Sequence, residues 1–158
     1  MFRGHHDRKR RGLAVAAFTG AGFLILFWAL YASGVIAPAD PDDPVAQFEA
    51  AFPLADALLV ATLLAAGVGL SRRRSYGLFC MVGAAGQTLY LGLLDLTFYA
   101  SRGRYSPPSG EAWVELVVNV LCLGGGALAL GACWRIWRKS WRRDVKTARS
   151  WSSARRAA

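Results

Sequence analysis

Four carboxyl groups lie in long apolar stretches of the chain, where ionisable side chains are rare. Glu49 and Asp56 are seven residues apart, so they would share one face of a helix, and Asp95 and Glu115 belong to two later stretches. An ionised acid near the centre of a bilayer costs about 2.5–3.5 kcal/mol on insertion scales. Such acids are retained when they are paired, protonated or turned toward a wet cavity. These four therefore mark a candidate functional site.

Amide and phenol groups occur in the same stretches. Glu115, Asn119, Cys122 and Gly126 follow one another at i, i+4, i+7 and i+11, so they form a stripe that we expect to face inward. Antiparallel neighbours would bring the acids and Asn119 to a similar depth in the outer half of a membrane. We predict the following residues as ligand-binding or proton-handling candidates: Glu49, Asp56, Asp95, Glu115, Asn119, Gln87 and Tyr99.

Four apolar segments would carry these groups, at about residues 13–36, 45–70, 76–99 and 112–137. A helix needs about 20 such residues to cross a bilayer. The first segment contains no charge, whereas a helix of a soluble bundle would show a polar stripe. The 158-residue chain is 54% hydrophobic. We predict an all-α, antiparallel up-down four-helix transmembrane bundle (residues 13–137) between basic tails at residues 1–12 and 138–158.

The positive charges predict the orientation. Seventeen of 19 Lys and Arg residues lie in residues 1–12, in the turn at residues 72–74 or after residue 134, and all three regions would share one side of the membrane. Positive charge marks the cytoplasmic side. With the Ala-, Gly- and Arg-rich composition, this predicts a multi-pass protein of the bacterial plasma membrane with both termini cytoplasmic. The net charge of +9 then indicates contact with anionic lipids of that leaflet and no nucleic-acid partner.

Two segments carry local signals. Pro53 either kinks one long second helix or begins the span, and we favour the kink, because residues 53–70 alone approach the lower length limit. Asp56 would then lie about 11 residues deep.

The C-terminal tail has a row of indoles flanked by cations, which predicts an amphipathic helix along the inner headgroups before a disordered end at residues 150–158. Its lipid-interface candidates are Trp134, Trp137, Trp141, Arg138 and Arg142.

No metal or cofactor is expected. His5, His6 and Asp7 lie together in the basic tail, but the sequence contains no third His, and its three Cys residues form no C-x-x-C pair.

Short segments in the last three spans resemble a group of small bacterial four-span integral membrane proteins. These segments are FPLAD (residues 52–56), LLDLTFY (93–99), GRY (103–105) and the E-x-x-x-N pair of Glu115 and Asn119. The resemblance implies the four-span fold and its topology, and it assigns no activity.

Three functions fit the acids. The first is binding of a small apolar or cationic ligand, a lipid or a membrane partner, in an aromatic-lined pocket beside Asp56 that includes Trp28, Tyr31 or Tyr99. The second is intramembrane acid–base catalysis, of the isomerase or cyclase type, on an isoprenoid or lipid. The third is proton-coupled transport or an accessory role in a membrane complex, as a homo-oligomer or with another protein.

A purely structural interpretation is the alternative to all three functions. In it, Arg102 and Arg104 neutralise Asp95 and Glu115.

Overall fold

The computed structural model describes residues 3–35, 44–106 and 110–157, which form helices joined by short turns. The helices are α1 (Arg3–Ala32), α2 (Pro44–Glu49), α3 (Pro53–Ser71), α4 (Ser75–Ser101) and α5 (Gly110–Ala157). Segments of four of them are long and apolar enough to cross a membrane, namely Arg8–Ala32, Pro53–Ser71, Ser75–Ser101 and Glu115–Lys139. The all-α class and the number of candidate spans are therefore confirmed.

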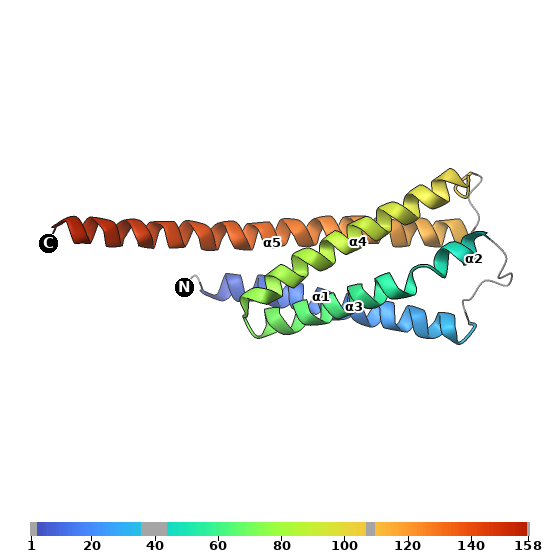
Figure 1. Cartoon of the computed structure of the whole chain (residues 1–158), viewed down its shortest axis with the longest axis horizontal. Coiled ribbons are helices and arrows are strands. Elements are labelled where there is room, and N and C mark those ends of the chain that lie inside the picture. Colours follow the sequence, from blue (N-terminus) through green and yellow to red (C-terminus); the bar gives the residue numbers. More distant parts are fainter. Residues whose placement is uncertain (1–2, 36–43, 107–109, 158) are drawn as a thin grey trace.

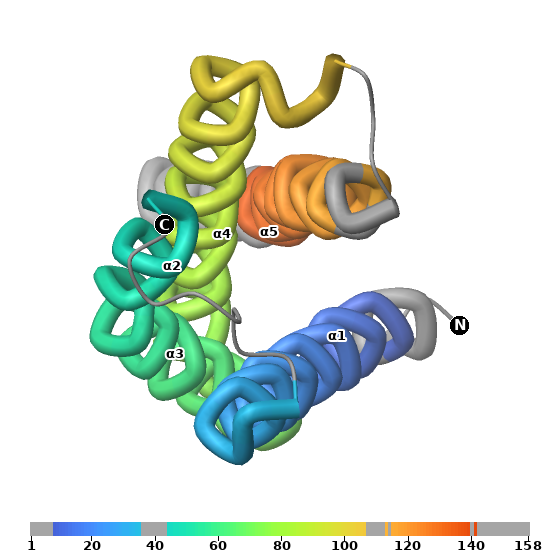
Figure 2. Tube along the Cα trace, turned by 90° about the vertical axis from the view of Figure 1, so that its right-hand side faces the viewer, coloured from blue at the N-terminus to red at the C-terminus, as the bar shows by residue number. Residues whose placement is uncertain are grey.

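The long helices pack in the order of the chain. Helix α1 lies against α3, α3 against α4, and α4 against α5, whereas α1 and α5 barely touch (Figures 1 and 2). Viewed from the end, the helices form an open arc with α1 and α5 at its two tips (Figure 2). The assembly of helices is therefore open on one side, between α1 and α5.

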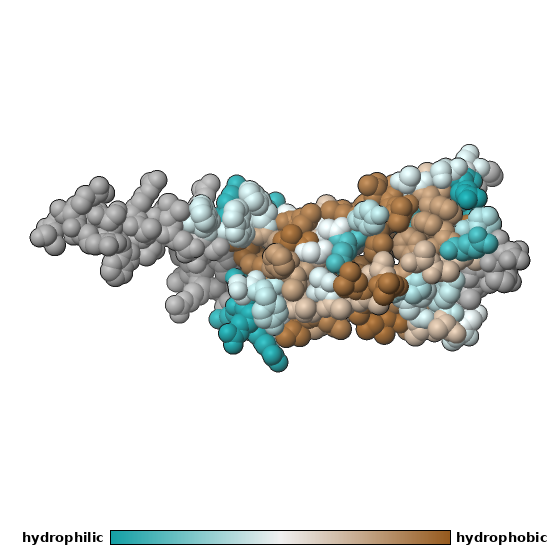
Figure 3. Space-filling view, viewed as in Figure 1, coloured by the Kyte–Doolittle hydropathy of each residue, from teal (hydrophilic) through white to brown (hydrophobic). Residues whose placement is uncertain are grey.

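The two ends of the molecule differ in charge. Figure 1 shows the start of α1, the turn between α3 and α4, and the C-terminal part of α5 at one end, which we call the basic end. It carries the cations of residues 8–11 and 72–74. The opposite end holds α2 and the start of α5 and is called the cavity end. Apolar side chains cover much of the surface between the two ends (Figure 3).

Small residues set the spacing of α1 and α3. Ala17 and Ala21 are fully buried, and a Cβ atom on Gly20 would lie 3.5 Å from Leu63. Small residues of α1 therefore form its contact with α3. Toward the basic end, apolar side chains from all four long helices form a continuous core that includes Leu13, Ala14, Leu63, Ala66, Leu70, Met81, Ala84, Cys133 and Ile136.

The predicted stripe on α5 does face inward. Asn119 is 2% exposed, and Gly126 is buried with its Cα against α4. A Cβ atom on Gly126 would lie 3.0 Å from the carbonyl oxygen of Ala85, and one on Gly92 would lie 3.0 Å from Cys122. Glycines on each helix therefore allow α4 and α5 to approach closely, as small residues do in membrane helix pairs.

The expected kink at Pro53 is wrong. Helix α2 ends at Glu49, a turn follows, and Pro53 begins α3. Proline has no N–H to donate and its φ suits the first turn, so it starts a helix without losing a hydrogen bond. The 19 residues of α3 still reach about 28 Å at 1.5 Å per residue. Asp56 consequently lies in the first turn of the span and not deep within it.

Both basic tails are helical. Residues 3–12 belong to α1, and α5 continues straight through residues 138–157, including most of the segment expected to be disordered (Figure 1). Helix α5 therefore has no break between the apolar span and the tail in the described residues. The three indoles do form an exposed row. The ring centroids of Trp134 and Trp137 lie 5.2 Å apart, and those of Trp137 and Trp141 lie 6.0 Å apart. Arg138 is exposed beside them, and the side chain of Arg142 lies outside the described residues.

The closest helix approach gives a test of the packing. A Cβ atom on Gly77 would clash with the backbone of Gly69 and Leu70, whereas one on Gly86 would meet nothing within 4 Å. We expect Gly77→Ala to lower stability by about 1–3 kcal/mol through overpacking. Gly86→Ala, on the same helix, should leave it unchanged or slightly raised. Thermal unfolding of both variants in detergent measures this, and equal shifts would contradict the packing described.

Candidate functional site

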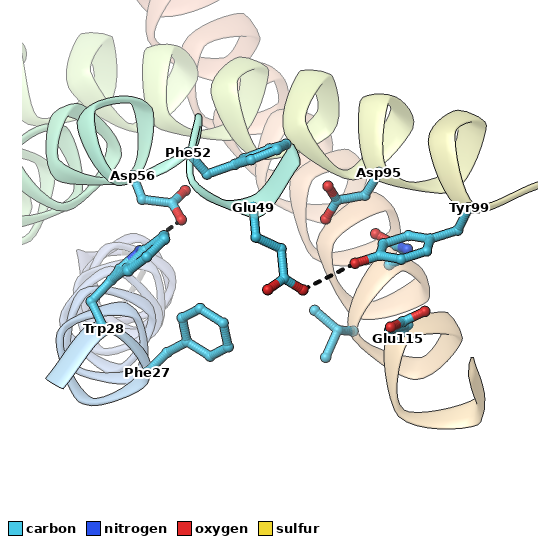
Figure 4. Close-up of a pocket in the computed structure, with 10 residues that line it drawn as sticks. Phe27, Trp28, Glu49, Phe52, Asp56, Asp95, Tyr99 and Glu115 are labelled. Carbon is cyan, nitrogen blue, oxygen red and sulfur yellow. Dashed lines mark hydrogen bonds between the residues drawn. The ribbon is translucent and has the colours of Figure 1, made fainter. Parts of the chain in front are cut away.

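A cavity of about 180 Å³ opens at the cavity end, between α1 on one side and α4 and α5 on the other (Figure 4). Its walls come from five helices, because α2 and the start of α3 also contribute lining residues. The lining residues are Phe27, Trp28, Glu49, Phe52, Asp56, Asp95, Tyr99, Glu115, Val118 and Asn119. Four carboxyl groups, one each from α2, α3, α4 and α5, thus meet at one space.

Helix α2 brings Glu49 to the cavity. Its Phe48 ring stacks on Phe98 of α4, with centroids 3.8 Å apart and planes 3° from parallel. This contact fixes the short helix against α4, so Glu49 reaches the Tyr99 hydroxyl, which donates a hydrogen bond to Glu49 Oε1 over 3.2 Å. An aromatic stack and one hydrogen bond therefore hold a carboxylate that a six-residue helix could not position alone.

Asp56 is held by α1. The indole Nε1 of Trp28 donates a hydrogen bond to Asp56 Oδ2 over 2.9 Å, and the Trp28 ring packs against Phe27 and Tyr31. Asp56 also lies in the first turn of α3, where the helix dipole favours a negative charge. The contact joins the first and second spans through a polar pair at the edge of the cavity.

Asp95 and Glu115 face the cavity from the outermost turns of α4 and α5. Asp95 lies six residues before α4 ends at Ser101, about 9 Å along the axis, and Glu115 five residues after α5 begins at Gly110. In Figure 4 both side chains point into the same space as Glu49 and Tyr99. The acids therefore form one group close to the end of the spans, where the cost of a charge is smaller than at the bilayer centre.

Asn119 is the most enclosed polar group of the lining. It is 2% exposed, and its Nδ2 donates a hydrogen bond to the Tyr105 hydroxyl over 3.4 Å. Its Oδ1 is buried and receives no hydrogen bond from any residue that the structure describes. Buried amide oxygens in proteins are nearly always paired with a protein group or an ordered water, so this oxygen is a candidate acceptor for a donor on a water or a ligand.

The structure places six of the seven sequence-predicted candidates at this cavity: Glu49, Asp56, Asp95, Tyr99, Glu115 and Asn119. Gln87 does not line it and lies further along α4 with its Oε1 buried and unpaired among the described residues. Of the aromatic residues expected beside Asp56, Trp28 and Tyr99 line the cavity, whereas Tyr31 packs behind Trp28.

In the structural interpretation, arginines neutralise the acids. The described residues do not show this for Asp95. Neither Asp56 nor Asp95 forms an ion pair within the described ranges, and the guanidinium of Arg102 lies 5.2 Å from the centroid of the Phe98 ring. Among the described residues, the cavity lining also contains no Lys or Arg. The site therefore offers carboxyl groups and aromatic faces to a ligand, and no cationic side chain.

Several functional side chains were missed in the sequence. Phe27, Phe52 and Val118 line the cavity, and Tyr105 holds Asn119. Phe27 had a signal, because it is one of three aromatic residues within one turn of α1. The others are apolar or lie in a loop, and nothing in their spacing distinguishes them from lipid-facing or solvent-facing residues.

A bound metal ion needs several ligand atoms within reach of one point. Within the described part of the chain, no three His, Cys, Asp or Glu side chains come close enough to hold one. The carboxyl groups surround a space instead of converging on a point, which suits an organic ligand.

Comparisons with known proteins assign nothing to the site. No family model matches the chain, and no curated protein or solved structure matches it.

The pair of Trp28 and Asp56 can be tested by a double-mutant cycle. We expect Trp28→Phe to destabilise the protein by about 1–3 kcal/mol, because a buried carboxyl loses its donor. The same substitution in an Asp56→Leu background should cost much less. Trp134→Phe, at an exposed indole on α5, is the control. Unfolding free energies in detergent measure the coupling, and additive effects would exclude an energetically significant bond between the two side chains.

Proposed function

We propose that the protein binds a small organic cation with an apolar body in this cavity. The observation that carries the proposal is that four carboxyl groups from four helices line one space without a cationic side chain among its lining residues. Carboxyl groups this near to one another repel when ionised. A bound cation relieves that repulsion, so the site should select positive charge.

The walls support an apolar body on the cation. Phe27, Trp28, Phe52 and Tyr99 present aromatic rings to the same space. Aromatic faces attract cations and also bury hydrocarbon. A cavity of about 150 Å³ accommodates benzene, so a space of about 180 Å³ suits a ligand with one ring or a short alkyl chain.

The packing of the basic end favours binding over transport. Residues such as Leu63, Leu70, Met81 and Ile136 form a buried core there. A transporter in this conformation would need a polar path through that core. Acid–base catalysis on an isoprenoid or lipid, proton-coupled transport and an accessory role in a complex stay predictions.

We further infer an antiparallel arrangement of the four spans in a bacterial plasma membrane, with the basic end in the cytoplasm. The clustering of cations at that end supports this orientation. The exposed row of Trp134, Trp137 and Trp141 would meet the inner headgroups, and Arg138 would contact anionic lipids there. The cavity then opens near the outer headgroups, which agrees with the resemblance to small bacterial four-span proteins.

The orientation has a direct test. A fluorescent protein fused after Ala158 should fluoresce in the cytoplasm, and alkaline phosphatase at the same position should be inactive, because it matures only outside. Inserted at residues 107–109, the phosphatase should be active. The reverse pattern would place the cavity on the cytoplasmic side and overturn the topology.

Cation binding can be measured with 2-phenylethyltrimethylammonium in dodecyl maltoside micelles, using protein-free micelles as the blank. Equilibrium dialysis should show saturable binding. Asp95→Asn should weaken it by about tenfold or more, because a charge-assisted contact contributes roughly 1.5–3 kcal/mol. Gln87→Leu, on the same helix but outside the cavity, is the matched control and should bind normally.

Two results would contradict the proposal. One is an absence of saturable binding both by this cation and by 2-phenylethylamine, and the other is equal binding by the hydrocarbon in which carbon replaces the nitrogen. Mass spectrometry of small molecules that co-purify with the protein would identify a natural ligand.

A further inference from the structure

The unpaired oxygen of Asn119 carries an inference about the chemical class of the ligand, and this inference rests on the proposed function. We propose that the ligand is a protonated amine, with N–H groups and an apolar body but without an acidic group. Asn119 would accept one N–H, and the neighbouring carboxyl groups would accept the others.

The N–H requirement follows from Asn119. Its Oδ1 is buried without a donor among the described residues, while its Nδ2 is already bonded to Tyr105. The amide therefore presents an acceptor, and hydrogen bonds to it need a donor on the ligand. An ammonium group carries up to three N–H donors, whereas a quaternary ammonium carries none. A quaternary cation would leave the Asn119 oxygen unpaired.

Competing ligands without a positive charge are excluded by the carboxyl groups. A neutral alcohol also has a donor for Asn119, but it brings no positive charge to the carboxyl groups that line the cavity. A protonated amine satisfies both features with a single group. Charge-assisted hydrogen bonds from N⁺–H to carboxylate are also stronger than neutral ones.

The absence of an acidic group on the ligand follows from the charge of the lining. None of the ten lining residues is Lys or Arg, so no side chain there could pair with a carboxylate or phosphate on the ligand. An amino acid would place its own carboxylate among four acids. The phosphate of an amine-bearing lipid headgroup would meet the same repulsion, unless it stayed outside the cavity.

Three ligands that share one phenylethyl body separate these requirements. 2-Phenylethylamine has the ammonium alone, 2-phenylethyltrimethylammonium lacks the N–H donors, and phenylalanine adds a carboxylate. We expect phenylethylamine to bind the wild-type protein in dodecyl maltoside micelles at least about tenfold more tightly than the quaternary cation. Phenylalanine should show no saturable binding.

Variants of Asn119 test whether its amide oxygen causes the preference for the amine over the quaternary cation. Asn119→Leu should bring the two cations to similar affinity, because the acceptor is lost. Asn119→Asp retains an acceptor of the same size and should keep the preference for the amine. If Asn119→Leu fails to fold, the ratio of the two cations on the wild-type protein still decides the question.

Lysophosphatidylethanolamine and lysophosphatidylcholine repeat the amine and quaternary comparison on a lipid. If the ethanolamine lipid competes with phenylethylamine and the choline lipid does not, the amine is supplied by a headgroup. If neither lipid competes, it is a free amine.

The outcomes distinguish the two proposals. If the quaternary cation binds as tightly as the amine, the amine inference is wrong and cation binding stands. Binding of phenylalanine at a similar affinity would also overturn the inference. If neither cation binds in a saturable way, the proposed function itself fails.

Discussion

A carboxyl group in a membrane-spanning segment is stable only beside polar partners or water, and this constraint organises the structure. One such group costs about 2.5–3.5 kcal/mol at the bilayer centre. The chain carries three of them, Asp56, Asp95 and Glu115, near the ends of α3, α4 and α5, and Glu49 of the short helix α2 joins them at the cavity. The Trp28 indole and the Tyr99 hydroxyl hold two of them. The fold thereby confines its polar groups to one cavity and leaves the rest of the spans free to pack by apolar contact.

The packing toward the basic end makes that confinement possible. Glycines and alanines let α1, α3, α4 and α5 approach closely, and apolar side chains fill this part with a buried core. At the other end, α1 and α5 separate, and aromatic side chains replace the small ones. The cavity is therefore the place where the arc of helices stays open. Its size follows from the separation of α1 from α5, while its charge follows from the acids on the remaining helices.

Much of this arrangement could be read from the sequence. Lengths of apolar runs predicted the spans, and helical periodicity placed Glu115, Asn119 and Gly126 on one inward face. The position of Pro53 was misjudged, because span length outweighed the preference of proline for a first turn, and Asp56 was placed too deep in consequence. Gln87 was included for its polarity alone. The bond from Trp28 to Asp56 could not be foreseen, because it depends on the rotation of α1 about its axis. The role of Phe48, which fixes α2 on α4, depends likewise on tertiary contact.

The central claim is that α1 and α5 enclose one cavity from opposite sides. Phe27 on α1 and Val118 on α5 both line it, whereas the adjacent Val117 is exposed on another face of α5. The most direct measurement is cross-linking of Phe27→Cys with Val118→Cys by a short bifunctional thiol reagent, after replacement of Cys80, Cys122 and Cys133. Mass spectrometry should find an intramolecular bridge for this pair and little for Phe27→Cys with Val117→Cys. Equal bridging of both pairs, or none of either, would show that the two helices do not face one another across a shared space.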